Sequence, residues 1–315
     1  MKSRLLTLAR GTAAVAFGLA LTLQGGCTTA QTAAPVVERS AQAYAQEPAL
    51  WVVRDADSTI YLFGTVHLLR DSTKWRTPKI EQALAQSQEL WVEIAEVGDQ
   101  AASAAAMQKL VPQYGIDPAR PLSSKLSPAE QARLKEVATR FGLQPAALEP
   151  MRPWLAALTL TVMSIQKAGY SGDAGVDTLL LKAFKDAGKP IKAFETVEQQ
   201  IRFFATFPPE IEIQFLQSTL RDIDKGAGMM DQLSDAWAKG DMETFDRLFA
   251  GEMRAQSPEL YKVLLVDRNE AWAKAIQERL QGSGVSFVAV GAGHLSGPDS
   301  VQARLKARGI GSTRQ

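Results

Sequence analysis

Thr59-Ile-Tyr-Leu-Phe-Gly-Thr-Val-His67 and Ser286-Phe-Val-Ala-Val-Gly-Ala-Gly-His294 are the two stretches that decide the fold of this 315-residue chain. Each begins with a run of apolar, β-branched or aromatic residues, which is typical of a buried β-strand. Each then passes through Gly-x-x-His, where the glycine permits a sharp turn at the end of the strand. Loops at the carboxyl ends of strands build the sites of α/β sheets, so we expect His67 and His294 to face one cleft.

The surrounding sequence predicts one α/β domain that covers residues 49–315. Residues 49–53 and 59–63 flank a turn-forming cluster and indicate a hairpin, and further strands are expected at residues 89–94 and 191–195. Helices are expected at residues 77–86, 127–141, 153–168, 176–187, 197–207, 211–224, 231–239, 242–249, 257–280 and 299–308. Because most helices lie in the middle of the chain, we expect a central mixed sheet flanked by helices, with a large helical insertion between its two ends.

The first 27 residues have the features of a signal peptide of the lipoprotein type. Basic residues within positions 1–10 precede an apolar run at residues 12–23 that is too short to span a bilayer, and the only cysteine, Cys27, ends the segment. We expect cleavage and acylation at Cys27, with ordinary cleavage within residues 28–34 as the alternative. Residues 28–48 predict a flexible tether. The mature protein is therefore expected in the periplasm, membrane-anchored through Cys27 or otherwise soluble there.

The balance of basic and acidic residues predicts no nucleic-acid partner. The chain has 35 basic and 34 acidic residues, which gives a net charge of +1 and no basic footprint for nucleic acid or an anionic membrane surface. A partner must therefore be inferred from the site.

The two histidines and one carboxylate form the centre of the expected site. Imidazole is the commonest protein metal ligand and transfers protons near neutral pH. Glu93 lies in an apolar strand, where an unpaired charge is costly to bury, so it needs solvent or a partner. Two histidines and a carboxylate suit a divalent transition metal with open positions for water and substrate. The alternative is that the histidines are ordinary polar residues at strand ends and that Glu93 faces outward from an edge strand.

Further candidates follow from neighbouring segments. Glu195 ends a predicted strand, although it could simply adjoin a helix N-cap. Arg268 and Asn269 lie within a predicted helix and could orient a carboxylate or stabilise an oxyanion, or could be surface residues. Gly64 and Gly291 open the two motifs, and we expect them at any bound cofactor.

A series of ordered motifs resembles the TraB/GumN family, also called TIKI-like, over residues 51–310. The motifs are Phe63-Gly-Thr-Val-His67, Glu93, Arg152-Pro153-Trp154, Gly175-Val176-Asp177, Ala187-Gly-Lys-Pro190, Glu195-Thr196-Val197-Glu198-Gln199-Gln200, Asp267-Arg268-Asn269 and Val290-Gly-Ala-Gly-His294-Leu295. The resemblance implies a fold shared with erythromycin-esterase-like and ChaN-like proteins.

The resemblance also implies a role for individual residues. TIKI members of this family are described as metal-dependent proteases that act through two Gly-x-x-His motifs and an acidic residue, which match His67, His294 and Glu93 here. These three residues would hold a divalent transition metal such as Mn, Co or Zn, and Arg268 with Asn269 matches the family's Arg-Asn pair. The Asp that TIKI-type members usually have two residues after the strand glutamate is replaced here by Ala95.

The function expected from these observations is an exported, metal-dependent, peptidase-like hydrolase that acts on a peptide or another small substrate of the cell envelope. Two alternatives stay open. One is a metal-free, esterase-like hydrolase in which His and Glu act as general base and acid. The other is a non-catalytic protein that binds haem, a metal or an envelope component through the same histidines.

Overall fold

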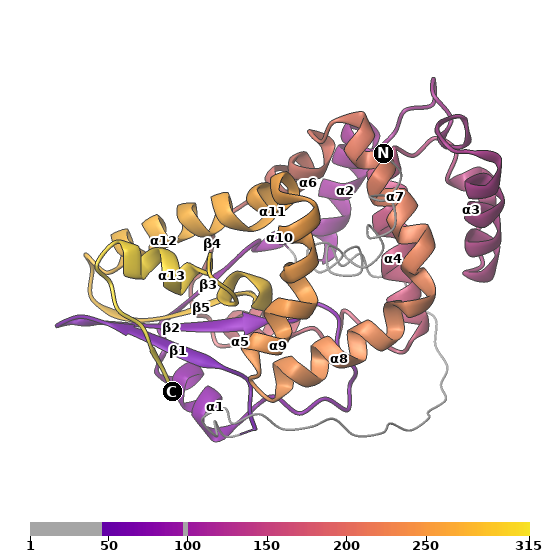
Figure 1. The fold of residues 1–315 in the computed structure, drawn as a ribbon. Helices are drawn as coiled ribbons and strands as arrows, with labels where there is room; N and C mark the ends of the chain where they lie inside the picture. The colour runs from indigo at the N-terminus through magenta and orange to yellow at the C-terminus, as the bar shows by residue number, and fades with distance from the viewer. Residues whose placement is uncertain (1–45, 97–99) are drawn as a thin grey trace.

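A mixed six-stranded sheet forms the centre of the computed structural model, which describes residues 46–96 and 100–315 (Figure 1). The strands are β1 (Leu50–Arg54), β2 (Ser58–Thr65), β3 (Glu89–Val92), β4 (Ile191–Ala193), β5 (Gly284–Gly291) and β6 (Thr313–Arg314), in the order β4-β3-β5-β2-β1-β6. The four strands β4, β3, β5 and β2 run parallel, whereas β1 is antiparallel to both β2 and β6. The expected mixed sheet of an α/β fold is confirmed.

The hairpin expected at the start of the domain is formed by β1 and β2. Leu50 pairs with Phe63 and Arg54 with Thr59. The strand β6 was not predicted, because a segment of two residues is too short to show an alternating pattern.

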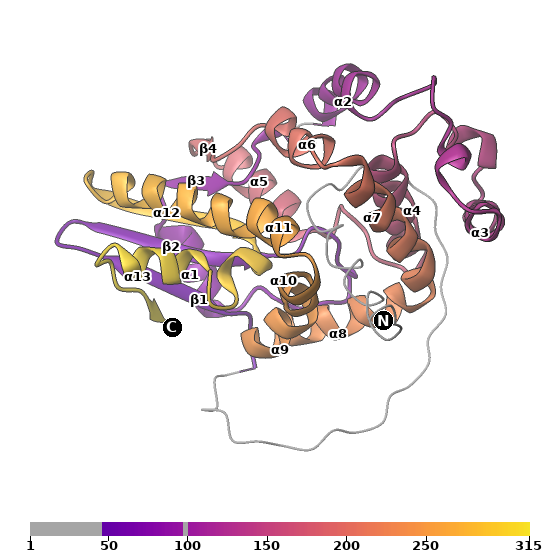
Figure 2. The same ribbon diagram turned by 45° about the horizontal axis from the view of Figure 1, so that its top comes forward.

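Helices cover both faces of the sheet. The described helices are α1 (Pro78–Gln86), α2 (Gln100–Tyr114), α3 (Pro128–Arg140), α4 (Pro153–Lys167), α5 (Val176–Asp186), α6 (Val197–Ala205), α7 (Pro209–Asp222), α8 (Gly226–Ala238), α9 (Met242–Asp246), α10 (Glu252–Gln256), α11 (Pro258–Tyr261), α12 (Asp267–Arg279) and α13 (Val301–Ala307). In Figure 2, α12 and α13 lie on one face of the sheet, and α1 and α5 lie on the other. The alternation along β2 explains this, because Ile60 and Leu62 pack with Trp272 of α12, whereas Tyr61 and Phe63 pack with Ile80 of α1.

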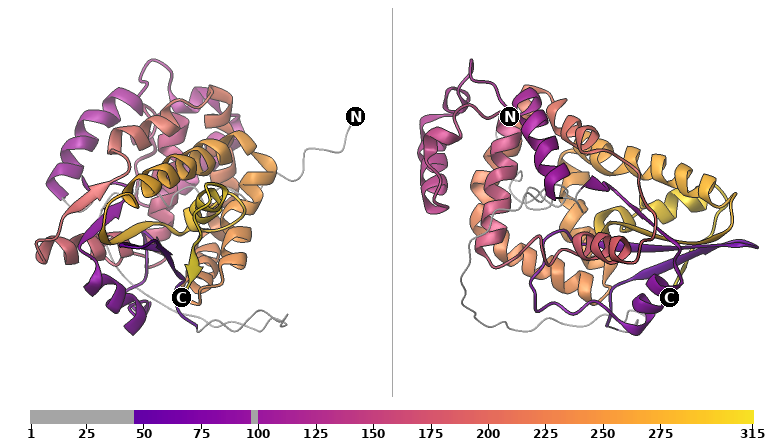
Figure 3. Two further views of the ribbon diagram at one scale, coloured as in Figure 1. Left: turned by 90° about the vertical axis from the view of Figure 1, so that its left-hand side faces the viewer. Right: turned by 180° about the vertical axis from the view of Figure 1, so that it is seen from behind.

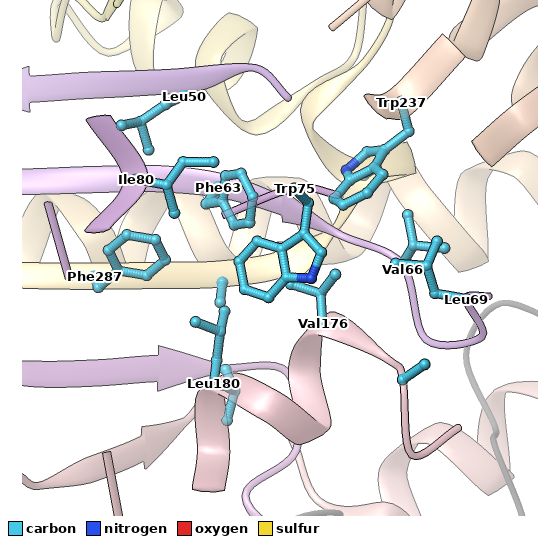
Figure 4. Packing of buried hydrophobic residues seen from close by; sticks show 14 of the residues in the cluster. Leu50, Phe63, Val66, Leu69, Trp75, Ile80, Val176, Leu180, Trp237 and Phe287 are labelled. Atoms are coloured by element: carbon cyan, nitrogen blue, oxygen red, sulfur yellow. The ribbon is translucent and has the colours of Figure 1, made fainter. Parts of the chain in front are cut away.

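Aromatic side chains fix the end of β2, as Figure 4 shows. Phe63 is fully buried and stacks on Trp75, with ring centroids 5.9 Å apart. Trp237 of α8 donates a hydrogen bond of 2.8 Å from its indole nitrogen to the carbonyl of Gly64. The turn that carries His67 therefore leaves a rigid, well-packed strand.

A helical part adjoins the carboxyl end of the sheet and has its own apolar core (Figures 1 and 3). Its centre is α4, which packs on α7 and α8. Most predicted helices are found within a few residues of their expected bounds. Helix α2 was not predicted, since its alanine-rich sequence with an internal Pro112 lacks a strong apolar period.

Four predicted elements need correction. The helix expected over residues 257–280 is divided by the π-helical turn η7 (Lys262–Val266), which follows α11 and precedes α12. A second π-helical turn, η6 (Arg247–Gly251), continues α9 into α10. The strands expected over residues 89–94 and 191–195 end at Val92 and Ala193, so Glu93 and Glu195 lie just beyond them.

The predicted signal peptide and Cys27 fall in residues 1–45, outside the described residues, and so does most of the predicted tether. Within residues 46–96 and 100–315, no helix has both the length and the apolar character needed to cross a membrane.

Candidate active site

The two Gly-x-x-His motifs lie side by side because their strands are parallel neighbours in register. Thr65 at the end of β2 pairs with Gly291 at the end of β5, and Val92 of the adjacent β3 pairs with Ala289. The chain leaves all three strands at the same edge of the sheet. His67, Glu93 and His294 therefore reach the same pocket.

Gly64 is needed for the close approach of the two motifs. A Cβ atom on this residue would lie only 2.9 Å from the Cα of Ala292 in the second motif. Real Cβ atoms do not approach a backbone atom this closely, so a larger residue would push the two histidine loops apart.

Replacing Gly64 with alanine is expected to lower the free energy of unfolding by about 1–3 kcal/mol, the usual cost of overpacking a rigid site. Urea unfolding followed by circular dichroism measures it. Gly228→Ala is the matched control, because a Cβ there meets no atom within 4 Å and Gly228 lies within α8. The control should be neutral or slightly stabilising. Equal stability of Gly64→Ala and the parent would contradict the close approach.

A buried cation stands between two buried carboxylates. Arg268 of α12 donates from Nη2 to Glu93 Oε2 at 2.6 Å and from Nε to Glu195 Oε1 at 2.8 Å. The three side chains are at most 10% exposed. Gln200 of α6 donates from Nε2 to both carboxylates, at 3.0 and 2.9 Å. Burial by itself would raise the pKa of Glu93, but the charge of Arg268 outweighs it and holds this pKa well below its usual range.

Arg268 uses all of its hydrogen-bond donors within the protein. A guanidinium has five N–H groups. Three of them go to Glu93 and Glu195, a fourth goes to the carbonyl of Leu264 at 3.1 Å, and the fifth goes to Nε2 of His294 at 3.0 Å. Arg268 in this arrangement has no N–H group to offer a substrate carboxylate or an oxyanion.

His294 is held as a neutral imidazole. Because Arg268 can only donate, Nε2 of His294 accepts, and the ring proton lies on Nδ1. That nitrogen faces Oδ1 of Asn269 at 2.6 Å, and the amide of Asn269 donates in turn to the carbonyl of Asp299 at 2.8 Å. The indole of Trp272 lies against the ring, with centroids 4.3 Å apart. Burial, together with the charge of Arg268, lowers the pKa of His294 to about 3.

His67 has the opposite environment. Its Nδ1 lies 2.6 Å from Oδ2 of Asp177, the second residue of α5, and Thr65 donates to the other carboxylate oxygen at 2.6 Å. Gly175 brings the start of α5 against this loop, since a Cβ there would lie 2.3 Å from the carbonyl oxygen of His67. Burial acts to lower the pKa of His67, but the adjacent Asp177 carboxylate outweighs it and raises this pKa above the ordinary value. The two histidines are therefore electrostatically unlike.

The pocket at these residues is small and has a volume of about 60 Å³. Its polar lining comes from His67, Glu93, Gln200, Arg268 and His294. Both imidazoles come close to Gly291, because the site of a Cβ on that residue lies 3.8 Å from Nε2 of His67 and 3.7 Å from Cδ2 of His294. A buried, charged cluster that opens into a pocket with perturbed pKa values is typical of a functional site.

Comparison with known proteins identifies the family. The model of the TraB/PrgY/gumN family matches residues 49–314. The chain belongs to this family. The protein YbaP of Escherichia coli (strain K12) is 28% identical over 185 residues, which cover 59% of this chain and 68% of YbaP. YbaP of Shigella flexneri matches equally well. No solved structure matches the chain. The resemblance inferred from the ordered motifs is thus confirmed.

The residues expected from the sequence are largely brought together in this TraB/PrgY/gumN chain. Four of the predicted residues line the pocket: His67, Glu93, Arg268 and His294. Glu195 and Asn269 do not line it, but they contact Arg268 and His294 respectively. Gly291 also lines the pocket and donates its backbone N–H to Glu93 at 2.7 Å. Gly64 packs against Ala292 instead.

Two polar residues of the site were not assigned a role from the sequence. They are Asp177 and Gln200, which contact His67 and Glu93 respectively. Both lie in motifs shared with the TraB/PrgY/gumN family, Gly175-Val-Asp177 and the segment from Glu195 to Gln200. Their place in these motifs was a signal that could have identified them. An aspartate in the first turn of a helix, however, is usually an ordinary surface residue.

The expected metal ligands do not fit a metal ion as they are arranged. Among residues 46–96 and 100–315, no three His, Cys, Asp or Glu side chains are grouped so that they could hold one. The reason is chemical: the guanidinium of Arg268 occupies both Nε2 of His294 and Oε2 of Glu93. A cation already satisfies the atoms that would bind the metal.

Proposed function

We propose that this chain is a hydrolase of carbonyl substrates such as peptides or esters, in which His67 acts as the general base. The observation that carries the proposal is the pairing of His67 with Asp177 at a pocket beside a buried charged cluster. A carboxylate at Nδ1 orients the imidazole and stabilises its protonated form. The other ring nitrogen, Nε2, lies toward Gly291 on the pocket wall, where a water molecule could be deprotonated.

The remaining polar residues would then position the base rather than transfer protons. His294 has its Nε2 bound to Arg268 and a strongly lowered pKa, so it is a poor proton acceptor near neutral pH. Glu93 stays ionised beside Arg268, and its negative charge is one of the influences that raise the pKa of His67. This division of roles favours the metal-free, acid–base form of the hydrolase over the metal-dependent, peptidase-like form.

The proposal is tested by incubating the purified protein with a panel of peptide amides and carboxylic esters and following products by mass spectrometry. We expect cleavage by the parent, loss of cleavage in His67→Ala, and unchanged activity in the presence of a chelator. Activity that is lost with the chelator and restored by Mn, Co or Zn would instead support the metal-dependent hydrolase. Full activity of a folded His67→Ala variant would remove the proposal. A Soret band that appears on adding haem and disappears in that variant would favour the binding protein.

We also propose export to the periplasm with a lipid anchor at Cys27. The basic start, short apolar run and single cysteine support it. Metabolic labelling with a fatty acid is expected to label the parent but not Cys27→Ser. A Cys27→Ser variant that still labels would exclude this anchor, whereas an exported but unlabelled parent would leave the soluble periplasmic form.

A further inference from the structure

The pocket has a second wall that is entirely apolar. It is formed by segments from the second half of the chain. The side chains that form it are Phe203 and Phe204 of α6, Phe249 of η6, Met253 of α10, and Leu264 and Leu265 of η7. Two of the three segments beyond α6 are π-helical turns, which occur in proteins most often at functional sites.

The polar wall has already used much of its hydrogen-bonding capacity. All five donors of Arg268 have acceptors, both carboxylate oxygens of Glu93 accept hydrogen bonds, and the amide nitrogen of Gln200 donates to two carboxylates. A charged substrate group would have to break one of these bonds to pair here, at a cost in desolvation. Affinity must therefore come mainly from contact with the apolar wall.

The size of the pocket limits what can make that contact. A volume of about 60 Å³ corresponds to roughly four positions of a water-sized atom. A branched aliphatic side chain of four carbons, such as that of leucine, has this size, whereas an aromatic ring is larger.

Phe249 closes one side of this space. Its ring stacks on Phe245, with centroids 5.6 Å apart, and lies so close to the second histidine motif that a Cβ on Gly293 would be 2.2 Å from its Cε1 atom. The ring is thus held between a buried aromatic residue and the loop that carries His294, and it cannot easily move aside.

We propose that the pocket selects a substrate with a neutral, aliphatic group of about four carbons next to the bond to be cleaved, and that Phe249 sets the upper limit of its size. This inference rests on the proposed hydrolase function for the position of the bond. Preference for an aliphatic group needs no turnover and can be measured by binding alone.

The test compares the N-acetyl amides of glycine, leucine and phenylalanine as ligands of the purified full chain, by calorimetry or ligand-observed NMR. The parent should bind the leucine compound roughly 10- to 200-fold more tightly than the glycine compound, as expected for filling an apolar pocket, and the phenylalanine compound should bind less well than leucine. In Phe249→Ala the order of leucine and phenylalanine should reverse, because the enlarged pocket admits the ring.

Phe141→Ala is the matched control, since Phe141 is partly buried but lies outside the pocket, and it should keep the parental order. If Phe249→Ala does not fold, Leu264→Ala provides the same enlargement from η7. Equal binding of the glycine and leucine compounds, or an unchanged order in a folded pocket variant, would overturn the inference. Selective binding without cleavage of any matching peptide or ester would leave this preference standing and reject the proposed hydrolase, so the two failures are distinguishable.

Discussion

Arg268→Met is expected to lower the free energy of unfolding by about 3–5 kcal/mol, the largest stability effect of any single substitution in the site. The substitution keeps much of the side-chain volume but removes the charge that compensates Glu93 and Glu195, and these carboxylates are only 7% and 8% exposed. It also leaves Nε2 of His294 without the donor at 3.0 Å. Chemical denaturation at pH 7 measures the loss.

The stability lost in Arg268→Met should depend on pH. In the parent, Arg268 holds the pKa of Glu93 below its ordinary value of 4.5, so Glu93 contributes stability above that pH and this contribution fades as the pH falls. In the variant, burial without the cation raises the pKa of Glu93 and keeps it protonated to higher pH. The stability difference between parent and variant should therefore begin to shrink as the pH falls through the raised pKa of Glu93 in the variant, above 4.5, and should shrink further below 4.5.

Lys274→Met is the control, because Lys274 lies on the same helix with its side chain 68% exposed and only a 3.9 Å ion pair to Glu278. It should change stability by less than about 0.5 kcal/mol. If Arg268→Met were no worse than this control, the buried cation would not stabilise the site.

Asp177→Asn is expected to lower kcat/KM by roughly 10²- to 10⁴-fold on whichever substrate the panel identifies, while the protein stays folded. The amide keeps an acceptor for Thr65 but loses the charge that orients and supports His67. Steady-state kinetics measures the loss, and Asp173→Asn, at an exposed position of the turn that precedes α5, should retain parental rates.

The pH profile separates a positioning role from general damage. A base works in its neutral form, so parental activity should rise with pH through the raised pKa of His67. Without the Asp177 charge, burial dominates and this limb should move to lower pH. The chain has only two histidines, so NMR titration can follow His67 directly. An unchanged limb and an unchanged titration in Asp177→Asn would refute the pairing.

Much of the site could be predicted because its residues stand where strands end. The apolar runs before His67 and His294 located β2 and β5, and an isolated charge in an apolar strand located Glu93. What the sequence could not show was how these side chains pair. The role of Arg268 depends on the first turn of α12 lying against Glu93 and His294 beyond the ends of β3 and β5, and this is a property of tertiary packing rather than of local pattern.

The differences between the predicted and observed elements have a similar cause. Periodicity predicts that residues 257–280 are helical, but it does not distinguish a π-helical turn from an α-helical one, and such a turn places Leu264 and Leu265 at the pocket. Asp177 and Gln200 look like ordinary residues at the start of a helix, and only their neighbours in space distinguish them.

The pairing of β2 with β5 also determines when the protein can fold. Ser58 of β2 pairs with Gly284 of β5, and β6 pairs with the outer edge of β1, where Thr313 lies opposite Val52. Strand β2 therefore cannot pair with β5 until residues more than 200 positions later are available. Contacts between such distant segments make folding slow. A nascent chain that stops before β5 lacks both the middle of its sheet and His294. The site therefore cannot form until β5 and the His294 loop have been synthesised.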